Sequence, residues 1–518
     1  MTAQQHSRSV KKQMTLRMLI ISTLMGVSTA HGAGYYFADI GVRSFSRGGA
    51  FIASADDLTA MYYNPAAIVR LDRPQLMLNV AGVQQFVNFQ RTAVPGNGPL
   101  DDSGSPTDIS YDPVENKAPP YAIPHFGFSI PNVLPRTTLA VGFYPPYAPD
   151  LSYPAQSSQR YSLVDTQVIQ TAAGPSVAHR LNKWISFGAG ISWNVLYADQ
   201  ELSISLPFDE SKAASAFANG DDGWSMDPNE DRANDVDFRF DATDKQGIGW
   251  NAGLLIEPPS QRWALGLMMQ APTRFNAKGS MSADFSEHIL YTEGALGQQV
   301  VLSKMSKDNS VEMNITMPLI LKGGLALRGD TGLGPVEVEL AGVWENWSSI
   351  EEITITDLNM VVDLNEEFLG GLLGIEDAVI DDDVRLPAGY TDAWSVRLGG
   401  QVDIRSKWTA RAGAFYETSA IPSETQSVAL IDGNKVGYGL GGSYRPSHRW
   451  AIDFGLSQSF PETRKITDSD VRQISVNPLT GDFLEGTTIG NGTYQSSLLI
   501  FGGGLNVFFG KEPASSEG

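Results

Sequence analysis

Residues Trp394–Ile404 read WSVRLGGQVDI, a stretch in which large apolar side chains alternate with small, polar or charged ones. Residues Trp450–Ser457, WAIDFGLS, repeat the pattern. A period of two places the two sets of side chains on opposite faces of a β-strand. The lengths are close to the roughly 9–11 residues that a tilted transmembrane strand needs. A soluble β-sandwich shows the same alternation, so the connections have to distinguish the two folds.

The pattern recurs beyond residue 75 and gives fourteen strand candidates. They lie near 75–90, 122–131, 136–145, 161–179, 183–206, 247–257, 261–280, 313–328, 335–357, 391–404, 407–418, 434–445, 448–460 and 494–509. Short turns near 132–135, 180–182, 258–260, 329–334, 405–406 and 446–447 alternate with long polar loops near 91–121, 146–160, 207–246, 281–312, 358–390, 419–433 and 461–493. Tight turns at a periplasmic rim and long loops at the other rim are typical of bacterial outer-membrane barrels. We therefore predict an all-β fold, a 14-stranded antiparallel transmembrane β-barrel over residues 75–509, followed by a polar tail over 510–518.

Tryptophans follow four of the predicted short turns: Trp184, Trp263, Trp408 and Trp450. Amphipathic rings prefer the membrane interface, so the four predict an aromatic girdle on the periplasmic side. Packing in a core is the alternative for any one of them.

The first 32 residues have the features of a secretory signal peptide. A positive region with Arg8, Lys11, Lys12 and Arg17 precedes a short apolar run over residues 18–27, and small residues follow it. The run is too short for a stable membrane anchor, so we predict export and removal of residues 1–32. A helix that is not cleaved is the alternative. No later stretch reaches the roughly 18 consecutive apolar residues of a transmembrane helix.

The composition excludes several classes of site. The chain has 518 residues, a net charge of -21 and no cysteine. Neither disulfides nor thiolate metal sites can form. The excess of acidic residues argues against nucleic-acid binding, which needs clustered Lys and Arg. No metal and no other cofactor is predicted.

Residues 33–74 do not read as a membrane strand, because they are rich in small residues and contain two short helical patches. A barrel of about fourteen strands encloses a lumen wider than its own side chains can fill. A small folded segment inside the barrel, a hatch, is therefore predicted for residues 33–74.

Short motifs recur in one order along the mature chain. They are Ala33-Gly34-Tyr35, Ser46-Arg47-Gly48-Gly49-Ala50, Ala55-Asp56-Asp57, Asn64-Pro65-Ala66, Gln159-Arg160-Tyr161, Gly174-Pro175-Ser176-Val177-Ala178, Pro318 and Tyr390-Thr391-Asp392-Ala393-Trp394. Each is weak alone, since Asn-Pro-Ala is common at turns, but their order and spacing together are specific. In these motifs the chain resembles the FadL/TodX family, outer-membrane transporters of long-chain fatty acids and aromatic hydrocarbons.

The resemblance implies passive uptake of hydrophobic small molecules, which extracellular loops capture and a pocket in the lumen holds. Release then occurs sideways through the wall near the third strand, after the N-terminus moves. Carried over by motif, the gating segment is Ala33, Gly34, Tyr35, Tyr36 and Phe37. The hatch residues are Arg47, Asp56, Asp57, Asn64, Pro65 and Ala66. The lateral-opening region is Phe143, Tyr144, Pro145, Pro146 and Tyr147.

The residues themselves leave two of these roles open. Pro145 and Pro146 cannot donate a ladder hydrogen bond, so they can mark an opening in the wall. They can equally end the strand and begin the loop. For Arg47, Asp56 and Asp57 an ion-paired scaffold is favoured over contact with the ligand.

Two long loops are strongly acidic, over 221–237 and 366–383. Such runs are usually solvated, although their oxygens could bind Ca²⁺. Acidic loops repel a fatty-acid carboxylate, although dissolved salt screens and weakens this repulsion. We therefore expect neutral hydrophobic ligands to be at least as suitable as fatty acids. Apolar residues of the outer loops predict ligand capture, with small loop cores as the alternative. They are Phe285, Ile289, Leu290, Phe368, Leu369, Leu372 and Leu373.

The competing classes are an outer-membrane lipid hydrolase and a structural or adhesive barrel. A hydrolase needs a nucleophile and a base at the outer rim. Among the histidines, His179 and His448 fall at periplasmic turns, and His288 lies in an outer loop beside Ser286. Sequence neighbours do not make a triad, so no enzyme is predicted. The expected partners are a hydrophobic small molecule, outer-membrane lipid and lipopolysaccharide, and the barrel-assembly machinery.

Overall fold

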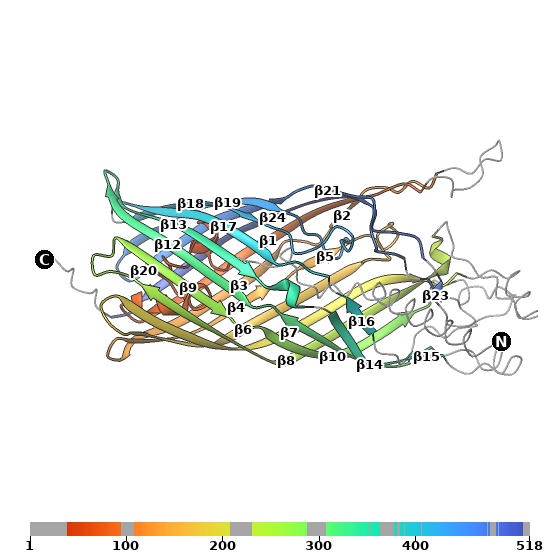
Figure 1. The fold of residues 1–518 in the computed structure, drawn as a ribbon, viewed down its shortest axis with the longest axis horizontal. Helices are drawn as coiled ribbons and strands as arrows, with labels where there is room; N and C mark the ends of the chain where they lie inside the picture. The colour runs from red at the N-terminus through yellow and green to blue at the C-terminus, as the bar shows by residue number, and fades with distance from the viewer. Residues whose placement is uncertain are drawn as a thin grey trace, which may run out of the picture.

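The computed structural model describes residues 39–94, 108–207, 230–286, 288, 307–350, 352–362, 378–380, 384–387, 389–405, 407–473, 475–476, 483–484 and 486–510. Consecutive strands pair antiparallel and close into one barrel, with the strands inclined to its long axis (Figure 1). The first strand, β1 (Gln75–Arg91), pairs with the last, β24 (Gly492–Phe508), from Gln75↔Phe508 to Arg91↔Gly492. Because β1 and β24 pair along their full lengths, the sheet closes on itself and neither of these two strands is left with a free edge.

The wall strands after β1 follow in chain order. They are β3 (Tyr121–Leu134), β4 (Thr137–Tyr147), β6 (Asp165–Arg180), β7 (Ile185–Ser205), β8 (Asp235–Ile256), β9 (Trp263–Gln270), β10 (Thr273–Asp284), β11 (Lys307–Met317), β12 (Ile320–Thr331), β13 (Gly334–Glu345), β14 (Glu352–Val362), β16 (Val384–Pro387), β17 (Ala393–Ile404), β18 (Trp408–Glu417), β19 (Lys435–Ser447), β20 (Trp450–Pro461) and β24. Four wall strands consist of two segments that continue one another: β9 with β10, β11 with β12, β13 with β14, and β16 with β17. Counted so, the barrel has the fourteen antiparallel strands that the sequence predicts.

Shorter elements complete the described chain. The remaining strands are β2 (Val114–Glu115), β5 (Asp150–Ser152), β15 (Ala378–Ile380), β21 (Arg464–Ile466), β22 (Ser475–Val476) and β23 (Phe483–Leu484). The helices are α2 (Val42–Phe45), α3 (Ala60–Tyr63), η1 (Pro65–Arg70), η2 (Arg232–Asn234) and η3 (Trp347–Ser349). In the described part of the chain, none of these helices has the length and hydrophobicity to cross a bilayer.

The predicted start of one strand is wrong by 12 residues. The strand expected at 247–257 begins at Asp235, inside the expected loop 207–246, and pairs with β7 as far as Ser205. Asp and Arg residues give this part of β8 the composition of a loop. Its inward positions, Val236 and Phe240, are nevertheless buried. The outward positions can be charged because a strand that rises beyond the hydrocarbon region meets water there.

The wall is oily outside, as the alternation predicts. In β17, Val396 and Leu398 are 58% and 55% exposed, whereas Ser395 and Arg397 between them are 5% and 2% exposed. Trp184 and Trp193, at 49% and 53%, stand nine positions apart along β7 and the turn before it. At about 3.3 Å per residue and a tilt near 40°, that separation is roughly 23 Å across the membrane, close to the roughly 25 Å apolar band of such barrels.

The predicted periplasmic girdle residues lie on this outer surface. Trp184, Trp408 and Trp450 are 49%, 48% and 38% exposed, and the ring of Trp263 lies 6.3 Å from that of Trp184. Packing in a core is therefore excluded for these rings.

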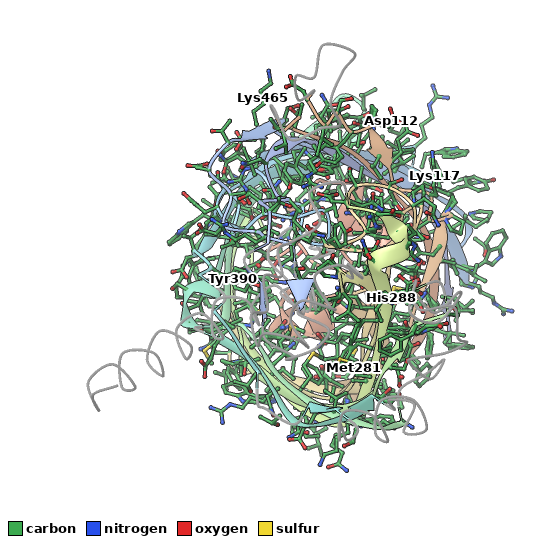
Figure 2. All side chains as sticks on the ribbon, turned by 90° about the vertical axis from the view of Figure 1, so that its right-hand side faces the viewer. Asp112, Lys117, Met281, His288, Tyr390 and Lys465 are labelled. Atoms are coloured by element: carbon green, nitrogen blue, oxygen red, sulfur yellow. The ribbon has the colours of Figure 1, made fainter. Side chains whose placement is uncertain are left out.

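Residues 39–74, which we call the plug, lie inside the barrel near its short-turn end (orange-red in Figure 1). Phe45, Phe51, Tyr62 and Ile68 of the plug are almost fully buried. A second apolar cluster, which includes Phe89, Tyr153 and Tyr494, lies among the loops at the other end. Seen from that end in Figure 2, His288 and Met281 lie within the ring of strands, whereas Lys117 and Lys465 lie at its outer edge.

Candidate functional site

The glycines of the motif Ser46-Arg47-Gly48-Gly49-Ala50 form a tight turn against the wall. Gly48 and Gly49 have φ values of 59° and 76°, which favour glycine. A Cβ on Gly48 would lie 2.9 Å from the backbone nitrogen of Ala414 in β18. Arg47 is fully buried and forms an ion pair of 2.9 Å with Glu337 of β13. The motif therefore fixes the plug to the strands around it.

The predicted hatch residues Asp56 and Asp57 share one cation. Arg43 lies 3.2 Å from Asp56, 3.8 Å from Asp57 and 3.0 Å from Asp453 of β20. Asp57 also accepts hydrogen bonds from the backbone nitrogen and hydroxyl of Thr59, at 2.8 and 2.6 Å. These contacts are with the plug itself and with the wall, so they support the scaffold interpretation.

Asn64, Pro65 and Ala66 begin the short helix η1. The side chain of Asn64 accepts from the nitrogen of Ala66 at 3.1 Å, and Pro65 occupies the first helical position. The Asn64 amide donates to the carbonyls of Ile52 and of Leu254 in β8, both at 3.2 Å. One side chain thus caps the helix, ties two parts of the plug together and binds the wall.

Glu339 of β13 holds the plug backbone directly. Its carboxylate accepts from the nitrogens of Ile52, Ala53 and Ser54 at 2.7, 3.0 and 2.8 Å, and also from the Ser54 hydroxyl. The side chain is fully buried. Sequence reasoning did not single out Glu339; the available signal was a charged residue at a lumen-facing position of a strand.

Wall glycines bring the plug closer than any other residue allows. A Cβ on Gly439 would lie 1.8 Å from the carbonyl oxygen of Phe45, and one on Gly413 would lie 2.0 Å from that of Arg47. The plug backbone therefore occupies the space that side chains of β18 and β19 would fill. Such close packing blocks a straight path through the lumen at this level.

Pairing between β3 and β4 stops partway along the strands. The last pair toward the long-loop end is Phe126↔Phe143. On its other side β3 remains paired with β1 as far as Tyr121. The β4–β6 register shifts between Tyr144 and Tyr147, so Pro145 and Pro146 have no recorded partner on either neighbour. The strand continues to Tyr147, beyond the prolines. The prolines therefore interrupt the pairing of the wall without ending the strand.

A small cavity lies behind this interruption. The plug residues 39–42 and Phe45, together with His125 and Pro145, form part of its lining. It has about 20 Å³ of room for the centre of a water molecule, against the roughly 300–1,000 Å³ of a small-molecule pocket. His125 Nδ1 is buried and, among the described residues, has no hydrogen-bond partner. The start of the plug would have to move before a ligand could occupy this place.

The lumen also contains a buried cation that sequence reasoning missed. Lys322 of β12 is 4% exposed, and its Nζ lies 3.7 Å from the ring centre of Tyr62 and 5.1 Å from that of Tyr63. Within the described residues, Nζ has no hydrogen-bond acceptor to donate to. Tyr144, one of the predicted lateral-opening residues, packs edge-on against Tyr62 at 5.4 Å. The wall interruption and the aromatic pair of the plug are therefore adjacent.

The motif Gln159-Arg160-Tyr161 ties outer segments together. Arg160 forms an ion pair of 2.6 Å with Asp235, and the Tyr161 hydroxyl donates to the same carboxylate at 2.9 Å. Arg160 also donates to the carbonyl of Glu230 at 2.6 Å.

Other predicted residues fall in two groups. Ala33, Gly34, Tyr35, Tyr36 and Phe37 of the gating segment lie outside the described residues, as do Ile289, Leu290, Phe368, Leu369, Leu372 and Leu373 of the outer loops and residues 1–32 of the signal peptide. Phe285 is described, and it is 4% exposed and packs in the main apolar cluster. Burial of Phe285 agrees with the alternative interpretation, a small packed core, and its role in ligand capture stays a prediction.

A closed barrel with an oily exterior and a filled lumen defines a plugged outer-membrane channel. The profile of one family, outer membrane protein transport protein (OMPP1/FadL/TodX), matches residues 23–495. The chain belongs to this family of outer-membrane transporters of hydrophobic compounds, as its motifs predict.

Relatives and solved structures agree with this assignment. The long-chain fatty acid transport protein of Escherichia coli (strain K12) is 22% identical over 506 residues, which cover 89% of this chain and 95% of that protein. The structure of a FadL homologue of Pseudomonas aeruginosa has a TM-score of 0.68 at 18% identity, covering 92% of this chain and all of that one (100%). The toluene transporter TodX of Pseudomonas putida has a TM-score of 0.59 at 16% identity, with coverage of 92% and 100%. The Escherichia coli protein and TodX are both named as transport proteins.

Proposed function

We propose that this protein takes up hydrophobic small molecules passively and releases them sideways, through the wall between β3 and β4. The observation that carries the proposal is the loss of pairing beyond Phe126↔Phe143, where Tyr121 to His125 have no pair on β4 and Pro145 and Pro146 have none on β6. Opening a barrel where two strands are fully paired would break a ladder of hydrogen bonds between them. Here those bonds are already missing, since proline has no N–H to donate.

The blocked lumen supports a lateral route. Backbone atoms of the plug contact the wall at Gly413 and Gly439, and ion pairs such as Arg47–Glu337 fix it there. A ligand that entered from the long-loop end would meet the plug before it reached the periplasmic rim. The interruption lies beside the plug, at His125 and Pro145.

Movement of the N-terminal segment is the proposed gating step. Asp39, Ile40 and Gly41 line the small cavity behind the interruption, and Asp39 is two positions after Phe37, the last residue of the predicted gating segment. Withdrawal of these residues would enlarge the cavity and connect the lumen with the interruption in the wall. The outer-loop residues predicted for capture keep that role as a proposal.

Two features favour different substrate classes. The acidic outer loops favour neutral hydrophobic molecules, which we propose are transported at least as well as fatty acids. Lys322 favours a carboxylate, because its buried ammonium group lies against the rings of Tyr62 and Tyr63 and has no hydrogen-bond acceptor among the described residues. A carboxylate that reached the lumen would gain a charge-assisted hydrogen bond there. The fatty-acid class is therefore the second candidate.

The lateral route can be tested by closing the interruption. Continuing the register of Phe126↔Phe143 places Pro124 opposite Pro145. The chain has no cysteine, so the thiols of a Pro124→Cys/Pro145→Cys pair can be bridged selectively in whole cells with a short bis-methanethiosulfonate reagent, which forms one disulfide with each thiol and releases methanesulfinate. Bridging is expected to stop uptake of a radiolabelled hydrophobic substrate, and reduction to restore it. The matched control is Phe128→Cys/Val141→Cys, which bridges the same two strands where they already pair. Unchanged uptake through the bridged Pro124/Pro145 variant would exclude release at this place.

The substrate class can be tested on the purified protein. Binding of toluene and of a long-chain fatty acid would be measured by calorimetry, with Lys322→Met as the variant. Loss of fatty-acid binding in Lys322→Met, with toluene binding retained, would assign Lys322 to the carboxylate. Tight binding of fatty acids by the wild type and none of toluene would refute the preference for neutral ligands.

A further inference from the structure

A continuous chain of buried ion pairs runs from the plug to an outer loop. Arg397 of β17 lies 2.8 Å from Asp39 and 2.9 Å from Glu417, the last residue of β18. Lys435, the first residue of β19, lies 3.1 Å from Glu417 and 2.9 Å from Asp432. All five side chains are buried. Five charges of alternating sign therefore connect two parts of the molecule that are far apart in the sequence.

At its outer end, the series of ion pairs reaches Asp432, which closes the loop of residues 418–434. We call this loop the outer cap. Asp432 accepts from the Ser419 hydroxyl and the Ala420 nitrogen, both at 3.0 Å, so it joins the beginning of the cap to its end. Val428 and Ile431 of the cap are buried in the apolar cluster at the long-loop end. The Val428 carbonyl accepts from the Tyr153 hydroxyl at 3.2 Å. The cap therefore packs over the outer end of the lumen.

The inner end of the chain lies where the proposed gate begins. Asp39 lines the cavity behind the wall interruption. The Asp39–Arg397 pair fills the space of a missing side chain, since a Cβ on Gly49 would lie 2.1 Å from Asp39 Oδ1 and 2.2 Å from an Arg397 nitrogen. Arg397 also donates to the carbonyl of Gly48 at 3.3 Å. The second glycine of the motif therefore makes room for the ion pair.

Burial makes the pairs depend on one another. Arg397 is shared by Asp39 and Glu417, and Glu417 by Arg397 and Lys435. When one member moves away, its neighbour keeps a buried charge with less compensation, which is costly at low dielectric. A displacement at either end therefore changes the free energy of holding the other end.

We propose that this chain couples the outer cap to the N-terminal end of the plug, with Arg397 as the central positioning residue. Displacement of the cap by a hydrophobic molecule at the outer mouth loosens Lys435 and Glu417. Arg397 then holds Asp39 less firmly, and the beginning of the plug at Asp39 and Ile40 is loosened. The inference rests on the proposed function, whose gate it would regulate.

The coupling can be measured without any substrate. Because the wild-type chain has no cysteine, one buried cysteine can report on each end: Val428→Cys in the cap and Ile40→Cys in the plug. The rate of thiol labelling in purified, folded protein reports how often each end opens. Asp39→Asn is expected to speed labelling of Val428→Cys by about five-fold or more, and Asp432→Asn to speed labelling of Ile40→Cys by a similar factor, because coupling between sites is reciprocal.

Controls separate coupling from local damage. Asp453→Asn disturbs the plug through Arg43, which does not belong to the series of ion pairs from Asp39 to Asp432. This variant is expected to leave the labelling rate of Val428→Cys unchanged. Asp39→Glu retains the charge and should label nearly as the wild type does. In a Glu417→Gln background, which breaks the middle of the chain, Asp39→Asn should no longer affect the cap.

Two results would overturn the inference. One is unchanged Val428→Cys labelling in folded Asp39→Asn protein, and the other is an equal effect of Asp453→Asn. Neither result touches the lateral route, which the bridged Pro124/Pro145 variant tests independently. Conversely, uptake through that bridged variant would refute the route and leave a measured coupling in place.

Discussion

The hydrogen bonds between Glu339 and the plug backbone allow a test of how stably the plug is docked in the lumen. Replacing Glu339 by Ala leaves three backbone N–H groups of Ile52, Ala53 and Ser54 without the acceptor they have at 2.7–3.0 Å. A hydrogen bond to a charged group contributes about 1.5–3 kcal/mol. Water entering the vacated space and the relief of burying a carboxylate offset part of the loss, which leaves a net cost of about 2–4 kcal/mol for plug docking.

A cost of about 3 kcal/mol raises the ratio of undocked to docked plug roughly 150-fold. Ion conductance of the purified protein in planar bilayers is expected to show frequent open events that the wild type lacks. Val338→Ala is the matched control, because Val338 is the adjacent residue and faces the lipid at 45% exposure. If folded Glu339→Ala protein conducted no more than this control, the carboxylate would not be what holds the plug.

Three further outcomes are expected. Gly439→Val should displace the plug from β19 and raise the ion conductance, because the new Cβ would lie 1.8 Å from the Phe45 carbonyl oxygen. The control Gly503→Ala should conduct as the wild type does, because its Cβ would have no neighbour nearer than 3.8 Å. Equal conductance of the two variants would contradict the packing argument. Asn64→Ala should destabilise plug docking by about 1–2 kcal/mol through loss of a helix cap, measured as faster protease cleavage within the plug; a cleavage rate equal to that of the wild type would show that the cap is dispensable. Burial lowers the pKa of His288 in the outer loop to about 4, below its ordinary 6.5, so the neutral ring stabilises the fold fully above pH 6.5 and less as the pH falls toward 4. The melting temperature of the wild type should therefore fall relative to His288→Gln over that range, and parallel curves for the two proteins would refute the assignment.

The sequence alone determined the barrel, because each strand has its own alternation of apolar and polar residues. The alternation at Trp394–Ile404 predicts which face meets lipid, and the exposures of Val396 and Arg397 follow it. Turn length set the two rims. The composition of residues 235–246 hid the start of β8. A strand that extends beyond the membrane does not need an apolar outer face there.

Only the tertiary structure decided how the interior is organised. Glu339, Lys322 and Arg397 look alike in sequence, as single charges on the polar faces of strands. One binds the plug backbone, one faces two tyrosine rings, and one joins Asp39 to Glu417. Such partners lie hundreds of positions apart, and no local pattern encodes which inward side chains meet across a lumen. Likewise, the sequence marks Pro145 and Pro146 as unable to donate hydrogen bonds, but the interruption beyond Phe126↔Phe143 depends on how two strands align in the closed sheet.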